Sequence, residues 1–207
     1  MSEKRSGGSV VQSAIGINRW LQQAPTVSEV RPSRCPFCGA PSCPVGGAVQ
    51  LQGHGTRKRQ VRGPCEAGAR AAQVEVVARR YRCVPCGAVI IVVPSEVCGR
   101  RVYSASAMGL ALALWGLLGA SAAEVRRRVC PAAVLGAAGA TGWETLRRWA
   151  REIRGRRLFR SSPDPGPSVS LRGVAARAAT VLAASAAPTT RALPIEHRAF
   201  LGAAHVA

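Results

Sequence analysis

The chain has 207 residues, enough for one or two small domains and a tail. Aromatic residues make up only 4% of it, which excludes a large aromatic core and predicts small, aliphatic ones. Lysine and arginine number 29 against 10 acidic residues, and the resulting net charge of +19 indicates a polyanionic partner, nucleic acid by default. A coding bias toward arginine accounts for part of such an excess. However, the basic residues cluster at positions 57–62, 126–128 and 147–160, which favours a contact surface.

Residues 1–34 are rich in serine, glycine and glutamine, with scattered apolar residues. A short helix is expected near residues 15–23. The composition otherwise predicts a loosely ordered N-terminal arm.

Two short cysteine motifs follow, Cys35-Pro-Phe-Cys38-Gly39 and Cys83-Val-Pro-Cys86-Gly87, with 44 residues between Cys38 and Cys83. A C-x2-C pair on a tight turn offers two thiolates to one metal ion, so two pairs supply a complete tetrahedral site. The glycine after each pair permits the left-handed backbone that curls the turn under the metal. The matched motifs read as an internal repeat and predict a zinc site made of Cys35, Cys38, Cys83 and Cys86.

Other assignments of these cysteines remain open at this point. Iron of the rubredoxin kind uses the same four sulfurs. Cys43, five residues beyond Cys38, is the first substitute ligand, and Cys65, Cys98 and the turn residue His54 are weaker ones. Disulfide pairing is disfavoured because no secretory signal opens this sequence, and we therefore expect a cytoplasmic protein.

Several strands are expected around the cysteine motifs. Residues 48–52 and 58–62 are predicted to pair around a turn at His54-Gly55. The clearest strand covers residues 73–83, where alternating apolar positions lead directly into the second motif. The β-branched run at residues 88–93 predicts another strand. A small antiparallel sheet bearing the zinc site follows from this pattern.

Three helices are expected after residue 100. Ser104 is positioned to cap the first, which runs to about residue 118. Two capping boxes, Ser121-Ala-Ala-Glu124 and Thr141-Gly-Trp-Glu144, open the second and third.

The third helix has one apolar face and one basic face. Spacings of three and four place Trp143, Leu146, Trp149 or Ala150, and Ile153 on the packing face. The remaining faces carry Arg147, Arg148, Arg151 and Arg154. Charges of one sign on a solvated face would repel one another, so this pattern predicts a helix that contacts DNA.

Residues 102–123 carry no charge and are long enough to span a bilayer. However, about half of them are alanine, serine or glycine, and basic clusters flank both ends. We therefore expect globular helices here and keep a membrane anchor as the competing hypothesis.

Beyond residue 160, Pro163, Pro165 and Pro167 predict a linker, and the alanine-rich sequence after it predicts a tail with a helix near residues 171–186. The predicted fold class is α+β, a zinc-ribbon sheet followed by a helix-turn-helix-like segment. We expect a flexible arm at residues 1–34, a zinc ribbon at 35–99, a helix-turn-helix-like helical domain at 100–160, and a linker and tail at 161–207.

These motifs together resemble the zinc-ribbon plus helix-turn-helix N-terminal region of ISL3-like bacterial transposases and of related small transposon-associated proteins. The resemblance covers roughly residues 35–154 and implies DNA binding at a defined end sequence. The motifs that carry it are Cys35-Pro-Phe-Cys38, His54-Gly55-Thr-Arg57-Lys58-Arg59, Arg79-Arg80-Tyr81-Arg82-Cys83, Cys83-Val-Pro-Cys86 and Leu146-Arg147-Arg148-Trp149.

The catalytic part of such a transposase is not expected in this chain. Strand transfer by two metal ions needs a cluster of carboxylates, whereas the single aspartate of the sequence, Asp164, lies in the proline-rich linker. No phosphate-binding loop, nucleophile elbow or Cys/His nucleophile pair stands out. We therefore predict a protein that is not an enzyme and has no small-molecule substrate.

The function predicted from the sequence is that of a zinc-stabilised protein that binds double-stranded DNA sequence-specifically. The residues predicted to contact DNA are Lys58, Arg59, Arg147, Arg148, Arg151 and Arg154. The competing hypotheses are a membrane-anchored zinc-ribbon protein that binds a protein partner, and a protein that binds structured RNA.

Overall fold

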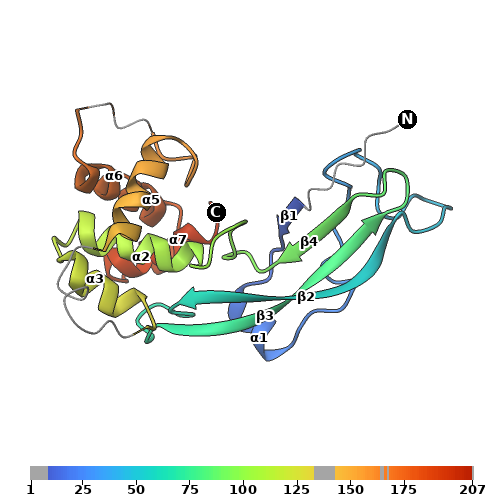
Figure 1. Ribbon diagram of the computed structural model, residues 1–207, viewed down its shortest axis with the longest axis horizontal. Coiled ribbons are helices and arrows are strands. Elements are labelled where there is room, and N and C mark those ends of the chain that lie inside the picture. The colour runs from blue at the N-terminus through green and yellow to red at the C-terminus, as the bar shows by residue number, and fades with distance from the viewer. Residues whose placement is uncertain (1–8, 133–142, 164–165, 167, 207) are drawn as a thin grey trace. The chain divides into compact units, whose positions relative to one another are not determined.

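The computed structural model describes residues 9–132, 143–163, 166 and 168–206 (Figure 1). Its fold is α+β, as the sequence predicts, with a four-stranded sheet and six α-helices in these residues. The chain divides into two compact units. The sheet unit comprises Met1–Gln60 and Glu75–Gly99, and the helical unit comprises Val61–Val74 and Arg100–Ala207.

The sheet has the strand order β1-β4-β3-β2, with β2 (Leu51–Gly63) and β3 (Ala72–Cys83) as its long strands. β4 (Val89–Val93) runs antiparallel to β3, and β1 (Ser9–Gln12) runs parallel to β4. The two strands predicted on either side of the second cysteine motif are confirmed, each beginning within one residue of its expected start. The predicted purely antiparallel sheet is wrong, because β1 pairs parallel to β4. β1 comes from a segment in which no strand is expected.

β2 is one continuous strand, whereas the sequence predicts two short strands around His54-Gly55. Gly55 has a φ of 77° within the strand, a conformation that glycine adopts without strain, and the chain continues past it. Lys58 contacts Glu75 and Arg62 contacts Gln73, so β2 runs antiparallel to β3. The predicted local hairpin is wrong because the 12-residue β3 offers β2 a longer ladder than a local turn does.

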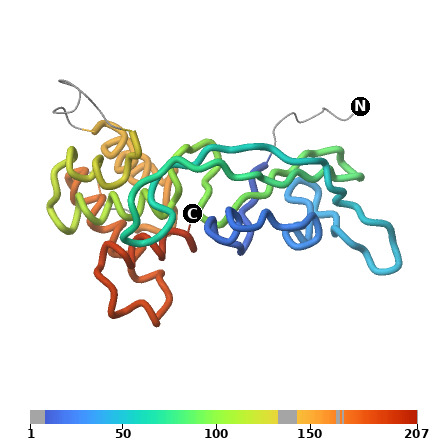
Figure 2. The backbone as a smooth tube through the Cα atoms, turned by 90° about the horizontal axis from the view of Figure 1, so that it is seen from below, coloured from blue at the N-terminus to red at the C-terminus, as the bar shows by residue number. Residues whose placement is uncertain are grey.

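The described residues before the first cysteine motif are ordered, whereas their composition predicts a loose arm. The short helix expected there is confirmed as α1 (Ile17–Gln22). Trp20 is 2% exposed, and its Nε1 donates to the Val77 carbonyl of β3 at 3.0 Å. The Tyr81 hydroxyl of β3 donates to the Val27 carbonyl at 2.6 Å, so this segment lies along β3 (Figure 2). Two aromatic side chains thus anchor a segment of polar composition.

Two of the predicted side-chain caps begin the first two helices of the helical unit. α2 (Ala105–Gly116) follows Ser104, whose Oγ accepts a backbone N–H at 3.1 Å. α3 (Ala122–Val129) follows Ser121, whose Oγ accepts the Glu124 N–H at 3.2 Å. Each bond satisfies one of the N–H groups that a helix start leaves unpaired, so both boundaries are set by local sequence.

α5 (Glu144–Arg154) buries the face that its apolar spacing predicts. The side chains of that face are each at most 5% exposed: Trp143, Leu146, Trp149 and Ile153. Tyr103, Trp143 and Trp149 form an aromatic cluster with edge-to-face contacts and ring centroids 5.2 to 5.7 Å apart. The helix begins after Trp143, which makes no side-chain cap, and Thr141 of the predicted capping box lies outside the described residues.

The described residues after 160 complete the helical unit, whereas their composition predicts a linker and a tail. Pro165 and Pro167 of the predicted linker lie outside the described residues. The predicted helix near residues 171–186 is confirmed as α6 (Leu171–Ala184). α6 and α7 (Ile195–Ala203) pack against α2 and against each other, with a short 3₁₀ turn at Pro188–Thr190 between them (Figure 1). The alanine-rich sequence is therefore the packing surface of three closely spaced helices.

The charge-free stretch at residues 102–123 does not form one long helix. It contains the 12-residue α2, of which all but the last residue are buried, and the chain turns at Gly119, whose φ is 71°. Among the residues that the structure describes, no helix has the length and apolarity needed to cross a membrane.

Gly202→Ala should destabilise the helical unit. A Cβ at this position would overlap the Leu182 carbonyl oxygen of α6 and lie 2.9 Å from the Ala186 nitrogen, so the helices would have to separate. We expect the free energy of unfolding to fall by about 1–3 kcal/mol, measured by urea denaturation with circular dichroism. Gly173→Ala on α6 is the matched control, because its Cβ would meet only side-chain atoms of Val169 and Ser170. Equal losses in both variants would contradict the close-packing argument.

Candidate metal centre and basic surface

Two backbone turns of the same geometry carry the four predicted thiols. In the first turn, the Cys35 N–H donates to the Ala40 carbonyl and the Gly39 N–H donates to the Cys35 carbonyl, both at 2.9 Å. The second turn repeats these bonds from Cys83 and Gly87 at 2.9 and 2.8 Å. Gly39 and Gly87 have φ values of 72° and 71°, the left-handed conformation that glycine accommodates. The internal repeat of the sequence is thus a repeat of backbone structure.

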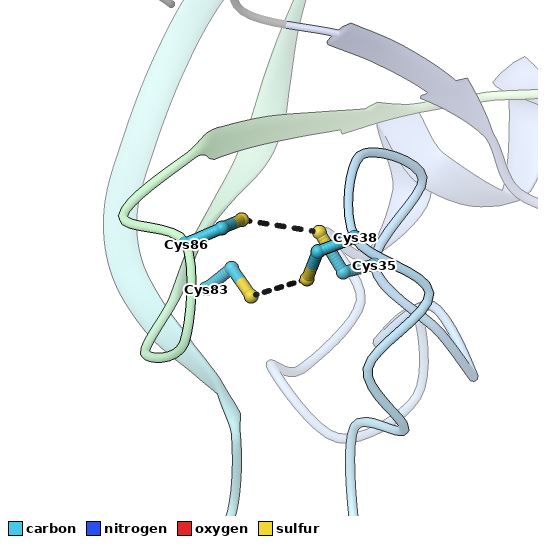
Figure 3. A group of neighbouring side chains, drawn as sticks. All are labelled: Cys35, Cys38, Cys83 and Cys86. Atoms are coloured by element: carbon cyan, nitrogen blue, oxygen red, sulfur yellow. Dashed lines mark hydrogen bonds between the residues drawn. The ribbon is translucent and has the colours of Figure 1, made fainter. Parts of the chain in front are cut away.

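The two turns bring the four Sγ atoms together. All lie within 4.8 Å of one another (Figure 3). The close pairs join the two turns, with 3.8 Å from Cys35 to Cys86 and 3.6 Å from Cys38 to Cys83. Metal–sulfur bonds of about 2.3 Å in a tetrahedron place the sulfurs about 3.8 Å apart. The arrangement therefore fits one metal ion bound by all four thiolates.

The four thiols differ in burial and in acidity. Cys35 and Cys83 are buried, whereas Cys38 and Cys86 are exposed. Burial opposes ionisation of Cys35, but hydrogen bonds from the backbone N–H groups of Cys38 and Phe37 outweigh it and hold the pKa of this thiol at about 7. Burial raises the pKa of Cys83. Full ionisation of the four thiols therefore needs a cation, and binding of a metal ion releases protons.

The substitute ligands considered from the sequence lie outside this cluster. Among the described residues, these four cysteines are the one set of three or more metal-ligating side chains close enough together to hold an ion. The Sγ atom of Cys43 accepts from the Arg31 guanidinium at 3.5 Å, and His54 is exposed in β2. Neither Cys65 nor Cys98 joins the cluster. The structure favours the predicted quartet over its substitutes.

The two basic residues predicted to contact DNA from β2 have partners in the sheet unit. Lys58 Nζ lies 2.9 Å from Glu75 Oε1, and this hydrogen bond and the charge of Glu75 raise the pKa of Lys58. Arg59 is half-buried and donates to the Cys98 carbonyl, and burial lowers the pKa of its guanidinium. Lys58 is exposed and neutralised, whereas Arg59 holds two segments of the sheet unit together.

The predicted basic residues of α5 have different surroundings. Arg147 and Arg148 are exposed and form no ion pair among the described residues. Arg151 is also exposed, with its Nη1 2.5 Å from Glu144 Oε1. Arg154 is half-buried and donates to a backbone carbonyl after the helix, that of Val169.

The second carboxylate of α5 is engaged as well. Glu152 Oε2 lies 2.5 Å from Nη1 of Arg101, and both side chains are mostly buried. With Glu144 paired to Arg151, the carboxylates of α5 leave the charges of Arg147 and Arg148 without a neutralising partner in the helix.

The basic loop directly after α5 is the end of the arginine cluster at residues 147–160, and none of its arginines is among the residues predicted to contact DNA. Arg156, Arg157 and Arg160 are exposed, whereas Leu158 and Phe159 between them are at most 5% exposed. Arg156 and Phe159 have φ values of 54° and 46°, which cost a non-glycine residue about 1–2 kcal/mol each. The buried pair fixes this loop and presents its arginines. The signal in the sequence is the apolar Leu-Phe pair inside an arginine run.

Comparison with known proteins found no matching family model, no matching curated protein and no matching solved structure. The resemblance to ISL3-like transposases stays a prediction.

Cys83→Ala should abolish stoichiometric metal binding and disorder the two cysteine turns. Removal of one thiolate leaves three ligands, and folding of a site of this kind is coupled to the free energy of metal binding. We expect about one metal ion per wild-type chain and less than a tenth of that in the variant, measured by mass spectrometry of the purified protein. Cys43→Ala is the matched control and should keep the wild-type content. Unchanged metal content in Cys83→Ala would remove it from the ligand set.

Proposed function

We propose that the protein binds double-stranded DNA through its helical unit and that a zinc ion stabilises its sheet unit as a zinc ribbon. The observation that carries the DNA contact is the exposed pair Arg147 and Arg148, unneutralised on a helix whose other face is fixed by the aromatic cluster. A rigid helix with free guanidinium groups suits the phosphates and guanine edges of a duplex.

Zinc is the ion that the ligand set favours. Four thiolates in a tetrahedron are typical of structural zinc sites, whereas catalytic zinc keeps a position open for water or substrate. Here Cys35, Cys38, Cys83 and Cys86 fill all four positions. The chemistry supplied by the ion is therefore a cross-link between two turns, which supports a structural role in a binding protein.

Further exposed arginines extend the basic surface of the helical unit. Arg127 and Arg128 on α3 are exposed and form no ion pair among the described residues. The loop after α5 adds Arg156, Arg157 and Arg160. Like charges so concentrated repel one another unless a polyanion neutralises them.

We infer a helix-turn-helix-like arrangement for α3 and α5, the helices before and after residues 133–142. Both helices pack against α2, the central helix of the unit. With the resemblance to the transposase N-terminal region, this arrangement supports α5 as the helix that reads the duplex sequence. We infer a transposase-derived DNA-binding part without a catalytic domain. The single aspartate of the chain argues against two-metal strand transfer by the chain itself.

The competing membrane-anchor hypothesis has less support. The charge-free stretch on which it rests contains α2, whose residues are buried against α6 and α7 of the helical unit. Burial in protein accounts for the apolar character of α2 without a bilayer.

The metal bound by protein purified from a medium that contains both zinc and iron should be zinc. We expect about one zinc per chain and no visible absorption, because the d shell of Zn²⁺ is filled. Elemental analysis and an absorption spectrum check this prediction. One iron per chain with intense visible bands would contradict the zinc assignment while leaving the four ligands in place.

Arg147→Ala combined with Arg148→Ala should weaken binding to duplex DNA and flatten its salt dependence. Loss of two phosphate contacts lowers the magnitude of the slope of log K against log salt by about 1.8. Fluorescence anisotropy of a labelled duplex across a salt series measures the slope.

The matched control for this experiment removes the same two charges outside α5. Arg70 and Arg191 are exposed in the helical unit, and Arg70→Ala combined with Arg191→Ala lowers the net charge equally. An equal change of slope in both double variants would indicate net charge rather than a contact by α5. No measurable duplex affinity in the wild-type chain would overturn the proposed function.

A further inference from the structure

Phe37 is the exposed aromatic side chain of the protein. The three Phe, four Trp and two Tyr residues of the chain all lie in the described part, and the other eight are buried or half-buried. Phe37 is 38% exposed. Phe37 is therefore the aromatic ring of this chain with the largest exposed fraction available to a partner.

The backbone beneath Phe37 is fixed on both sides. The residue lies between Cys35 and Cys38 in the first cysteine turn, and its N–H donates to Cys35 Sγ at 3.5 Å. Both of these cysteines are candidate ligands of the metal centre. A ring held on such a backbone loses little conformational freedom on binding, so contact with a flat partner costs little entropy.

Arginines at equivalent positions precede the two cysteine turns. Arg34 is exposed, and its Nη1 donates to the Gly39 carbonyl at 3.2 Å, which holds the guanidinium on the turn that carries Phe37. Arg82 is exposed and forms no ion pair among the described residues. It directly precedes Cys83, whose Sγ lies 3.6 Å from that of Cys38, the residue after Phe37. The sequence has no acidic residue at positions 30–65 or 76–95, so the segments that form the two turns bring no carboxylate to this surface.

The combination of a fixed ring, two guanidinium groups and no carboxylate suits an unpaired nucleobase and its phosphates. Bases inside a duplex have their faces covered by neighbours, whereas a single strand can stack a base on an aromatic ring. We propose that Phe37, Arg34 and Arg82 form a stacking site for single-stranded nucleic acid on the sheet unit. This site goes beyond the duplex contact proposed for α5 and does not depend on it.

The test compares substitutions that separate stacking from apolar contact. Binding of the metal-loaded full chain to labelled oligodeoxythymidine and oligouridine is measured by fluorescence anisotropy, and the two strands distinguish DNA from RNA as the source of the base. Phe37→Ala should weaken binding by about 5- to 150-fold, the value of one stacked base. Phe37→Leu keeps apolar area without a ring and should weaken it similarly, whereas Phe37→Trp should retain it.

Val84→Ala is the matched control on the second turn. Val84 is 55% exposed and follows Cys83, so its truncation removes apolar surface near the same centre without removing a ring. It should leave single-strand affinity within about twofold of wild type, and metal content checks that every variant keeps its two turns. Wild-type affinity in Phe37→Leu, or a loss in Val84→Ala as large as that in Phe37→Ala, would overturn stacking in favour of a general apolar contact, as for a protein partner.

The outcomes separate this site from the proposed function. Arg147→Ala with Arg148→Ala should lower duplex affinity and leave the effect of Phe37→Ala on single strands unchanged. Absence of duplex binding with a Phe37-dependent single-strand affinity would overturn the function proposed for α5 and support the stacking site. A wild-type chain without single-strand affinity, or one whose affinity survives Phe37→Ala, would overturn the stacking site alone.

Discussion

Four sulfur atoms within 4.8 Å of one another are the constraint on which the sheet unit depends. As thiolates they would repel one another, more strongly where burial lowers the effective dielectric constant. A cation reverses this repulsion and ties the turn before β2 to the turn between β3 and β4. The sheet unit has few large buried side chains, among them Trp20, Leu51, Tyr81 and Ile90. A metal ion bound by the four thiolates would supply the stability that such a small core lacks.

The features that the sequence predicts correctly are those whose causes are local. The cysteine turns, the caps at Ser104 and Ser121 and the alternation of β3 each depend on residues within a few positions of one another. The features missed depend on distant partners. Gly55 alone predicts a turn, whereas pairing with β3 keeps β2 continuous through it. The alanine-rich sequence after the linker predicts a tail, whereas its helices α6 and α7 pack against α2. The candidate metal site was predictable because its spacing is repeated, whereas exposure of Phe37 emerges only from the fold.

Charge counting overestimates the surface available to a polyanion. Arg59, Arg79 and Arg154 donate to backbone carbonyls, and Arg101 pairs with Glu152 in a mostly buried position. These arginines have a structural role, because the N–H groups of the planar guanidinium donate to backbone carbonyl groups. Sequence alone does not separate these residues from exposed ones, since both kinds lie in the same clusters. The basic surface is therefore defined by the arginines that remain exposed after this internal bonding.

The two units obtain their rigidity from different chemistry. A metal ion at the candidate centre would fix the cysteine turns. The helical unit is fixed by the aromatic cluster and by helices that approach each other closely at glycine residues. The end of β2, the start of β3 and the turn between them belong to the helical unit. There the Arg62 N–H donates to the Val102 carbonyl at 2.8 Å, and Val61 is buried. That end is thus held by contacts that need no metal. Because the two units are rigid for separate reasons, the base contact proposed on one unit and the duplex contact proposed on the other should be independent, so that either could be lost without the other.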